Sequence, residues 1–234
     1  MDYKISPIGV MRSCFKDKFG VPRQPGMVSA AKGVIELSSE YGRPEAVRGL
    51  EEFSHIWVLF WFHQAQREQW KPTVRPPRLG GNQRLGVFST RSPFRPNPIG
   101  MSVVELERVE LGQGKVRLHV KGLDLIDETP VIDIKPYLTY VDAVPTAQAG
   151  FAGEAPRHLK IEFLPEAQEQ CIRYQQFYPD LYELICQSLA LDPRPAYSAD
   201  EDRVYGIRLY DFDVRWQVRQ ESVLVLKLLK IFEE

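Results

Sequence analysis

Apolar and polar residues alternate with the two-residue period of β-strands over much of the first 140 residues. The densest apolar stretch runs unbroken from Ile56 to Phe62 within residues 53–62, which is typical of a strand covered on both faces. Gly112-Gln113-Gly114 separates two alternating stretches and predicts a hairpin. The strands predicted in this half of the chain span residues 3–12, 33–37, 53–62, 101–111, 115–121 and 131–134.

The pattern changes after a stretch rich in Ala, Gly and Pro at residues 144–156. Residues 166–177 and 180–191 repeat apolar positions with the helical period. Strand-like alternation then returns and predicts a small antiparallel sheet at residues 204–210, 212–218 and 223–231. The sequence therefore predicts a mainly β domain over residues 1–145 and a small α+β domain over residues 157–234.

Two proline-rich loops contain polar side chains suited to ligand binding. Residues 88–100 combine Arg91, Arg95 and Asn97 with three prolines, and residues 16–26 place Arg23 and an amide between two prolines. Proline restricts its own backbone and that of the preceding residue, so such loops present side chains at a low entropic cost. Both loops could simply be surface connections. If they are functional, we expect them to meet at one site.

Further polar residues follow the predicted strands. His63 and Gln64 end the densest strand, where a structural hydrogen bond and a chemical role both remain open. The acids Asp124, Asp127 and Asp133, with Lys135, either line a pocket or form a salt-bridged rim.

Charge is nearly balanced over the whole chain but not along it. The formal net charge is -1 and the composition is 44% hydrophobic and 26% charged, as expected of a folded protein without a globally basic surface. Residues 67–95 nevertheless hold seven Arg and Lys residues and one acid, which suits a nucleic acid or a solvated basic face. Arginines also alternate with aromatic residues at 203–219, a pattern that suits RNA or a packed sheet with a charged outer face.

Several classes of protein are disfavoured by missing motifs. The chain has no zinc-type His or Cys spacing, no Walker loop, no nucleophile elbow and no dinucleotide-binding glycine set. We therefore expect no metal. Its three cysteines predict buried thiols in a reducing compartment. Without a membrane-length apolar run or a signal peptide, the expected location is the cytoplasm.

Four motifs carry a resemblance to a known family. They are Val-Pro-Arg-Gln-Pro-Gly at 21–26, Ser-His-Ile-Trp at 54–57 with Phe-His-Gln at 62–64, Thr-Arg-Ser-Pro-Phe-Arg-Pro-Asn-Pro-Ile-Gly at 90–100, and Leu-Asp-Leu-Ile-Asp at 123–127 followed by residues 129–137. Together they resemble the TrmO (TsaA-like, formerly YaeB) family of S-adenosylmethionine-dependent tRNA methyltransferases over about residues 3–142. Residues 192–197 and 211–216 resemble the C-terminal domain of its bacterial members.

The resemblance implies a single-sheeted β-barrel, unlike Rossmann methyltransferases, that works as a homodimer. It implies methylation of N6 of threonylcarbamoyl-adenosine (t6A) at position 37, beside the anticodon of threonine tRNAs. The cofactor-binding residues that it implies are Arg23, Gln24, Pro25, His63, Gln64, Arg91, Met101, Leu123, Asp124 and Leu125. Glu128 departs from the glycine expected in an Asp-Gly-Thr-Pro turn, and an L residue there predicts a different turn shape.

Roles in chemistry and RNA binding are further hypotheses. A carboxylate must accept the proton of the attacking nitrogen, and we assign this role to Asp127, with Asp133 as the alternative. The arginines predicted to contact tRNA are Arg95, Arg194, Arg203, Arg208 and Arg215, of which Arg95 could instead serve the cofactor or the loop itself. A non-catalytic RNA-binding module and a small-molecule-binding regulatory protein remain the competing classes.

Overall fold

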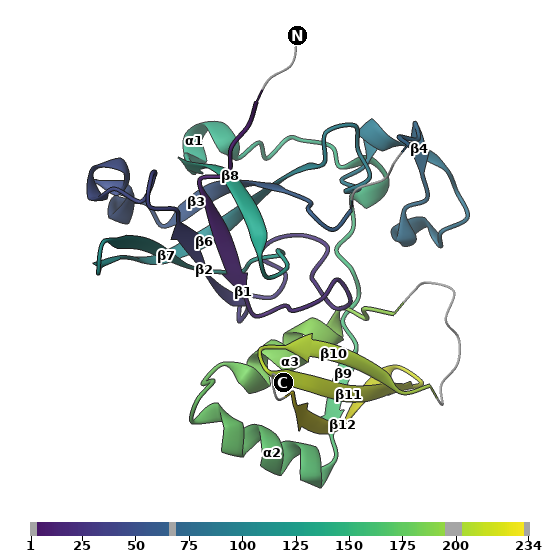
Figure 1. Ribbon diagram of the computed structural model, residues 1–234. Helices are drawn as coiled ribbons and strands as arrows, with labels where there is room; N and C mark the ends of the chain where they lie inside the picture. Colours follow the sequence, from purple (N-terminus) through teal and green to yellow (C-terminus); the bar gives the residue numbers. More distant parts are fainter. Residues whose placement is uncertain (1–3, 66–68, 195–202, 232–234) are drawn as a thin grey trace.

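Six antiparallel strands close into a barrel in the computed structural model, which describes residues 4–65, 69–194 and 203–231 (Figure 1). Neighbouring strands follow the order β1-β2-β7-β6-β3-β8, and β8 pairs with β1 to complete the ring. The strands are β1 (Gly9–Ser13), β2 (Lys32–Leu37), β3 (His55–Trp61), β6 (Ile99–Gly112), β7 (Lys115–Lys121) and β8 (Thr129–Pro136). The predicted mainly β fold with a single-sheeted barrel is confirmed.

The strand β3 alternates between the barrel interior and its outer wall. Ile56, Val58 and Phe60 are buried inside the barrel, whereas the residues between them are only half-buried. The prediction that this strand is covered on both faces is therefore wrong. In a closed antiparallel barrel one face of every strand points outward, and here Trp57 on that face donates a hydrogen bond from Nε1 to Asp142 at 3.0 Å.

The ends of the other barrel strands differ slightly from prediction. The first strand begins at Gly9, so residues 4–8 are not part of it. The hairpin between β6 and β7 is confirmed, and positive φ angles of 52° at Gln113 and 68° at Gly114 fit the turn that tight hairpins prefer. Glu128 adopts a φ of 62° itself, so the turn accommodates an L residue by backbone strain.

Short elements occupy the connections of the barrel. The 3₁₀ helices η1 and η2 lie between β2 and β3, and η1 begins at Pro44, a residue that favours the first turn of a helix. The long connection from β3 to β6 contains the small hairpin of β4 and β5. The bounds are η1 (Pro44–Val47), η2 (Leu50–Glu52), β4 (Thr73–Val74), η3 (Pro77–Leu79), β5 (Leu85–Gly86), η4 (Val87–Ser89), α1 (Thr139–Asp142) and η5 (Gly150–Ala152).

The C-terminal part is a four-stranded sheet packed against two helices. The predicted helices and the three predicted strands are all present, and β9 is a strand that the sequence did not reveal, paired in parallel with β12. The elements are β9 (Lys160–Phe163), α2 (Pro165–Gln175), α3 (Leu181–Ala190), β10 (Tyr205–Leu209), β11 (Phe212–Arg219) and β12 (Ser222–Lys230). No helix in the described ranges is long and apolar enough to cross a membrane.

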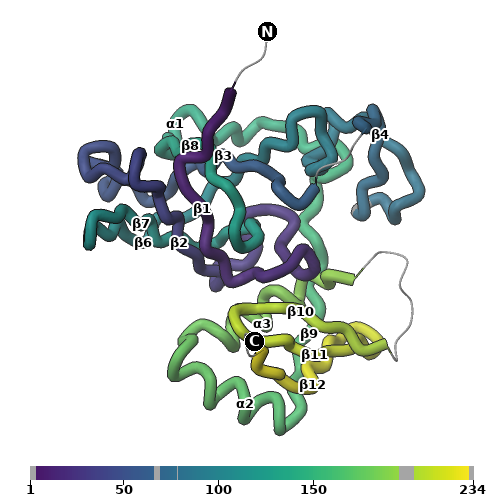
Figure 2. Tube along the Cα trace, in the orientation of Figure 1, coloured from purple at the N-terminus to yellow at the C-terminus, as the bar shows by residue number. Residues whose placement is uncertain are grey.

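The loop of residues 14–26, called the bridging loop below, joins the barrel to the C-terminal sheet. Phe15 forms an isolated β-bridge with Leu209, and the Tyr210 amide donates to the Cys14 carbonyl at 2.8 Å. Buried residues of both parts form one hydrophobic cluster. Figure 2 shows the loop running between the barrel and β10. The domain division at residues 145 and 157 stays a prediction.

All three cysteines are free thiols, as predicted. Cys14 and Cys171 are buried, but Cys186 is only half-buried, so the expectation of three buried thiols is wrong for Cys186. Cys186 lies on α3 between the fully buried Ile185 and the half-buried Gln187, at the edge of the helix face that packs on the sheet.

Candidate active site

The two proline-rich loops meet beside the barrel, as predicted. Arg91 donates a hydrogen bond from Nη1 to the side-chain carbonyl of Gln24. The Gly26 amide donates to the Gly122 carbonyl at 2.7 Å, which draws the bridging loop toward residues 123–125. Three segments far apart in the sequence therefore converge at one place, and each carries residues that were predicted to bind a cofactor.

Asp124 supplies a carboxylate at the place where these three segments meet. The Ser102 hydroxyl, on the interior face of β6, donates to Asp124 Oδ1 at 2.6 Å. Burial raises the pKa of Asp124 to about 6, while the Ser102 hydrogen bond and the Arg91 charge limit the rise. Asp124 is consequently a stronger base than an exposed aspartate. A serine inside a strand gave no sequence signal, and Ser102 was not among the predicted residues.

His63 and Gln64 follow the end of β3, where residues 62–64 contact both loops. The Phe62 amide donates to the Pro98 carbonyl at 2.8 Å, and Lys18 Nζ donates to the Gln64 carbonyl. Burial, and secondarily the Lys18 charge, lowers the pKa of His63, which keeps its imidazole neutral at pH 7. His63 is therefore available as a neutral hydrogen-bonding group.

The other predicted cofactor residues fall into two groups. Leu123 and Leu125 have side chains fully buried in the core, so only their main-chain groups can contact a ligand. Met101 is 58% exposed, and as the neighbour of buried Ser102 it points to the opposite face of β6. Arg23 is exposed and Pro25 half-buried on the bridging loop. The structure thus separates the Met101 side chain from Asp124.

Asp127, the predicted proton acceptor, is already engaged by the bridging loop. Its Oδ1 accepts from the Ser13 amide at 2.7 Å, and its Oδ2 pairs with Lys16 Nζ at 2.7 Å. These contacts anchor the start of the loop. The alternative, Asp133, forms an exposed ion pair with Lys135 at 3.1 Å, which fits the salt-bridged rim and not the pocket.

Arg95 holds its own loop together. Its Nη1 donates to the carbonyls of Thr90 at 2.8 Å, Ser92 at 3.3 Å and Val87 at 3.4 Å. Of the roles left open for Arg95, the observed contacts support the structural one. The turn that it closes carries Arg91, so Arg95 positions an arginine of the pocket.

Arg208 and Arg215 of the C-terminal sheet lie apart from the aromatic residues near them in the sequence. Tyr205, Phe212 and Trp216 are buried in the core, so they offer no surface to RNA bases. Arg208 and Arg215 lie on the opposite face of the sheet, where Arg215 pairs with Asp213 at 2.6 Å. The aromatic and cationic residues alternate with period two, and this spacing is the signal that places them on opposite faces.

Two further tail arginines lie at the ends of the gap in the described residues. Arg203 lies over the Tyr205 ring, with 5.1 Å from its guanidinium carbon to the ring centroid. Arg194 donates a bidentate pair of hydrogen bonds to the Asp192 carboxylate, from Nε to Oδ1 at 2.7 Å and from Nη2 to Oδ2 at 2.8 Å. Its side chain is only 17% exposed. The rest of the motif at 195–197 lies outside the described residues.

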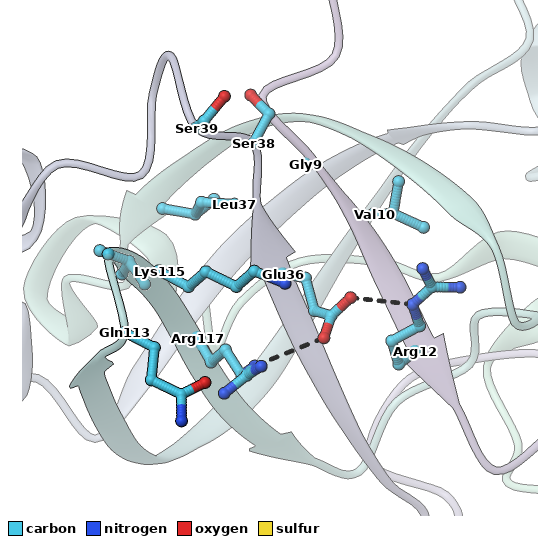
Figure 3. Close-up of a pocket in the computed structure, with 12 residues that line it drawn as sticks. Gly9, Val10, Arg12, Glu36, Leu37, Ser38, Ser39, Gln113, Lys115 and Arg117 are labelled. Carbon is cyan, nitrogen blue, oxygen red and sulfur yellow. Dashed lines mark hydrogen bonds and ion pairs between the residues drawn. The ribbon is translucent and has the colours of Figure 1, made fainter.

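A hollow of about 380 Å³ lies elsewhere, on the outer wall between β1, β2 and β7 (Figure 3). Glu36 at its centre pairs with Arg12 at 3.1 Å and with Arg117 at 3.4 Å. Beside it, hydrogen bonds from His119, Arg117 and Arg108 lower the pKa of Glu110 to about 2. None of the predicted cofactor residues lines this hollow. Three of its charged groups, Arg12, Glu36 and Arg117, satisfy one another.

The residues around Asp124 fit S-adenosylmethionine by their chemistry. Arg91 and Arg23 suit its carboxylate, Asp124 suits its amino group, a ribose hydroxyl or the sulfonium charge, and the main chain near Leu123 suits its base. Within the described ranges, no group of three His, Cys, Asp or Glu side chains is close enough to hold a metal ion. The fold defines a closed β-barrel protein of the non-Rossmann type, and the residues gathered around Asp124 suit a small charged cofactor.

Comparison with known families identifies the group. The family model described as the tRNA-methyltransferase O N-terminal domain matches residues 10–143, and the TrmO C-terminal domain matches residues 156–231. The chain belongs to the tRNA-methyltransferase O family.

Individual relatives match over nearly the whole chain. A tRNA (adenine(37)-N6)-methyltransferase of Escherichia coli is 49% identical over 97% of both chains. A putative S-adenosylmethionine-dependent methyltransferase, RcsF, of Pseudomonas aeruginosa is 50% identical over 96% of both. The crystal structure of TrmO from Pseudomonas aeruginosa superposes with a TM-score of 0.84 at 43% identity, covering 98% of this chain and 99% of that one.

Proposed function

We propose that this protein transfers a methyl group from S-adenosylmethionine to N6 of adenine 37 in tRNA. The observation that carries the proposal is the meeting of Arg91, Gln24 and Asp124 beside the barrel of a chain that both family models match. The finer substrate, the t6A nucleoside of threonine tRNAs, and a cytoplasmic homodimer are parts of the same proposal. They rest on the motifs at 21–26, 90–100 and 123–127.

The arginines of the two loops hold the cofactor in this proposal. When bound, S-adenosylmethionine supplies an electrophilic methyl group on a positively charged sulfur. Arg91 and Arg23 pair with its carboxylate, and the main chain of residues 123–125 contacts its nucleoside. Because Gln24 already fixes Arg91, less freedom is lost on binding. Alignment of the reacting groups can contribute on the order of 7 kcal/mol to catalysis.

Asp124 is the better candidate for the proton acceptor than Asp127. The exocyclic nitrogen of adenine is a poor nucleophile because its lone pair is delocalised into the ring, so a base must take its proton. Asp124 has a pKa raised to about 6 and lies beside Arg91. Both oxygens of Asp127 already accept hydrogen bonds, one from Ser13 at the end of β1 and one from Lys16 of the bridging loop. We therefore assign the role of proton acceptor to Asp124 and a positioning role to Asp127.

Methyl transfer from labelled S-adenosylmethionine to tRNA tests the proposal. Asp124→Asn is expected to lower kcat by about 100-fold or more, since a general base contributes 10²–10⁴-fold. Asp127→Asn is the matched control, and its main expected effect is on stability. Isothermal titration must show that both variants still bind the cofactor. Loss of transfer only in Asp127→Asn would reverse the assignment.

The same assay separates the competing classes. Retention of tRNA without label transfer would mean a non-catalytic RNA-binding module, and cofactor binding without either would mean a regulatory protein. Threonine tRNA with and without t6A, compared with other tRNAs, tests the finer substrate. Sedimentation of the full chain with and without tRNA tests the homodimer.

A further inference from the structure

Two aromatic rings contact each other on the surface of the connection between β3 and β6. Trp70 is 50% exposed and Phe88 is 73% exposed, and their rings stack with centroids 6.4 Å apart and planes 29° from parallel. Exposed rings in contact expel little water on folding, so core packing does not explain them. Figure 1 shows that this connection, around β4, projects to one side of the barrel.

The surroundings of the rings are cationic. Residues 69–95 contain no Asp or Glu, and Lys71, Arg75 and Arg84 are exposed. None of these three takes part in an ion pair among the described residues. A ligand that complements flat rings and unpaired cations is itself flat and anionic. Single-stranded nucleic acid has this chemistry, since its bases stack on aromatic rings and its phosphates attract cations.

The rings are anchored close to the pocket. Phe88 precedes Arg91 by three residues, and three residues span at most about 10 Å. Buried Val87 and the hydrogen bonds of Arg95 fix the turn between them. The Arg95 guanidinium carbon also lies 5.9 Å from the Phe88 ring centroid, which holds the ring in place. A span of about 10 Å equals roughly three stacked nucleotides at 3.4 Å each.

We propose that Trp70 and Phe88 form a stacking surface for an unpaired tRNA base next to the target adenine, with Lys71 and Arg84 contacting adjacent phosphates. The inference rests on the proposed function and names a part of the tRNA-binding surface. It places base stacking on the β3–β6 connection, away from the C-terminal sheet, where Tyr205, Phe212 and Trp216 are buried.

The test measures the Kd and KM for tRNA of Trp70→Leu and Phe88→Leu in the full chain. Both are expected to rise at least about fivefold, since stacking contributes 1–3 kcal/mol per base and 1.4 kcal/mol is tenfold. Trp70→Phe retains a ring and should restore most of the affinity. Phe177→Leu, at a residue that is 71% exposed on the C-terminal part, is the matched control and should change neither constant.

Salt dependence separates stacking from charge. Lys71→Ala and Arg84→Ala should each reduce the slope of log K against log salt by about 0.7 to 0.9, whereas the ring variants should leave the slope unchanged. Thermal unfolding and cofactor titration should match the unaltered protein in all variants. Unchanged tRNA affinity in both ring variants, or an equal loss in Phe177→Leu, would overturn the inference.

Two other results have distinct meanings. If the ring variants change the sedimentation behaviour but not the affinity for tRNA, a second copy of the chain covers the rings and the inference fails. If the unaltered protein methylates no tRNA, the proposed function itself fails. Normal methylation with normal KM in the ring variants would overturn the stacking surface alone.

Discussion

The bridging loop and the 69–95 segment both carry arginines to the same pocket, but they are held in opposite ways. The bridging loop is covered by the C-terminal sheet, where Phe19 stacks on Tyr205 and Trp216 with centroids 6.3 Å and 6.4 Å apart. The 69–95 segment relies on its own turn, closed by Arg95, and leaves the rings of Trp70 and Phe88 exposed.

The difference teaches how one protein could meet the needs of the two ligands in the proposed function. A small cofactor would be bound most tightly by a preorganised wall, which the fixed bridging loop could supply. A large RNA would need an accessible surface with cations and aromatic rings, which the exposed segment could supply. Perturbing the bridging loop should therefore change stability and cofactor affinity, whereas perturbing the 69–95 segment should act on tRNA with little effect on folding.

Gly20→Ala should have the largest effect on stability. Gly20 has a φ of 93°, and a Cβ there would lie 2.1 Å from the Ile207 side chain. Overpacking and backbone strain together should cost about 2 to 4 kcal/mol and weaken cofactor binding. Urea unfolding measures the loss. Gly26→Ala is the control, because its φ is 76° but a Cβ would meet nothing within 4 Å, so only about 1 kcal/mol is expected. Equal losses would mean that the contact with Ile207 does not hold the loop.

The pH dependence of stability should differ between the unaltered protein and Asp124→Asn. Because burial raises the pKa of Asp124 from 3.8 to about 6, the folded state binds its proton more tightly than the unfolded state. The contribution of Asp124 to stability is thus largest below pH 4 and falls as pH rises to about 6, by at most about 3 kcal/mol.

The difference in free energy of unfolding between the two proteins, measured from pH 4 to pH 7, isolates this contribution. As pH rises, the free energy of unfolding of Asp124→Asn should increase relative to that of the unaltered protein. A difference that does not depend on pH would contradict the raised pKa of Asp124. Methyl transfer, which needs the ionised carboxylate, should decline below about pH 6 in the unaltered protein.

Arg95→Lys should cost about 1 kcal/mol of stability and weaken cofactor binding. Lysine keeps the charge but cannot donate from a planar group to the carbonyls of Val87, Thr90 and Ser92 together. Urea unfolding and isothermal titration provide the measurements. Arg84→Lys is the control, since the described contacts of Arg84 include no hydrogen bond. If Arg95→Lys bound cofactor normally, the turn would not position Arg91.

The ion pair between Lys32 and Asp180 should contribute least. The two groups are 2.6 Å apart across the junction of the barrel and α3, but their side chains are 40% and 37% exposed. A double-mutant cycle with Lys32→Met and Asp180→Asn should give about 0.5 kcal/mol at low salt and almost nothing at 1 M salt. A coupling above 2 kcal/mol would mean that charge, and not apolar packing, joins the two parts.

Patterns local in the sequence predicted much of the fold. Strand alternation located five of the barrel strands within a few residues, but it placed the start of the remaining strand, β1, six residues too early. Helical spacing located α2 and α3, and Gly112-Gln113-Gly114 located the hairpin. The meeting of Arg91 with Gln24 was also predicted, because two loops of the same unusual composition suggested one site.

Other features depend on contacts that a linear pattern does not encode. Ser102 became part of the site only because the chain that follows β7 places Asp124 beside β6, the pairing partner of β7. Trp70 and Trp216 are similar residues in the sequence, yet one is half exposed and the other fully buried. The short strand β9 forms because β12, some 60 residues later, supplies its hydrogen-bonding partner.

The β-bridge between Phe15 and Leu209 also has a consequence for how the protein is made. It joins positions separated by nearly the whole chain, so a ribosome must synthesise β10 before the bridging loop can settle. Such distant pairing is slow, because the chain loses the entropy of closing a long loop before the stabilising contacts can form. A nascent chain can form barrel hairpins early, but the bridging loop reaches its final position beside residues 122–125 only when synthesis is almost complete. Truncated chains released by the ribosome would thus lack this arrangement.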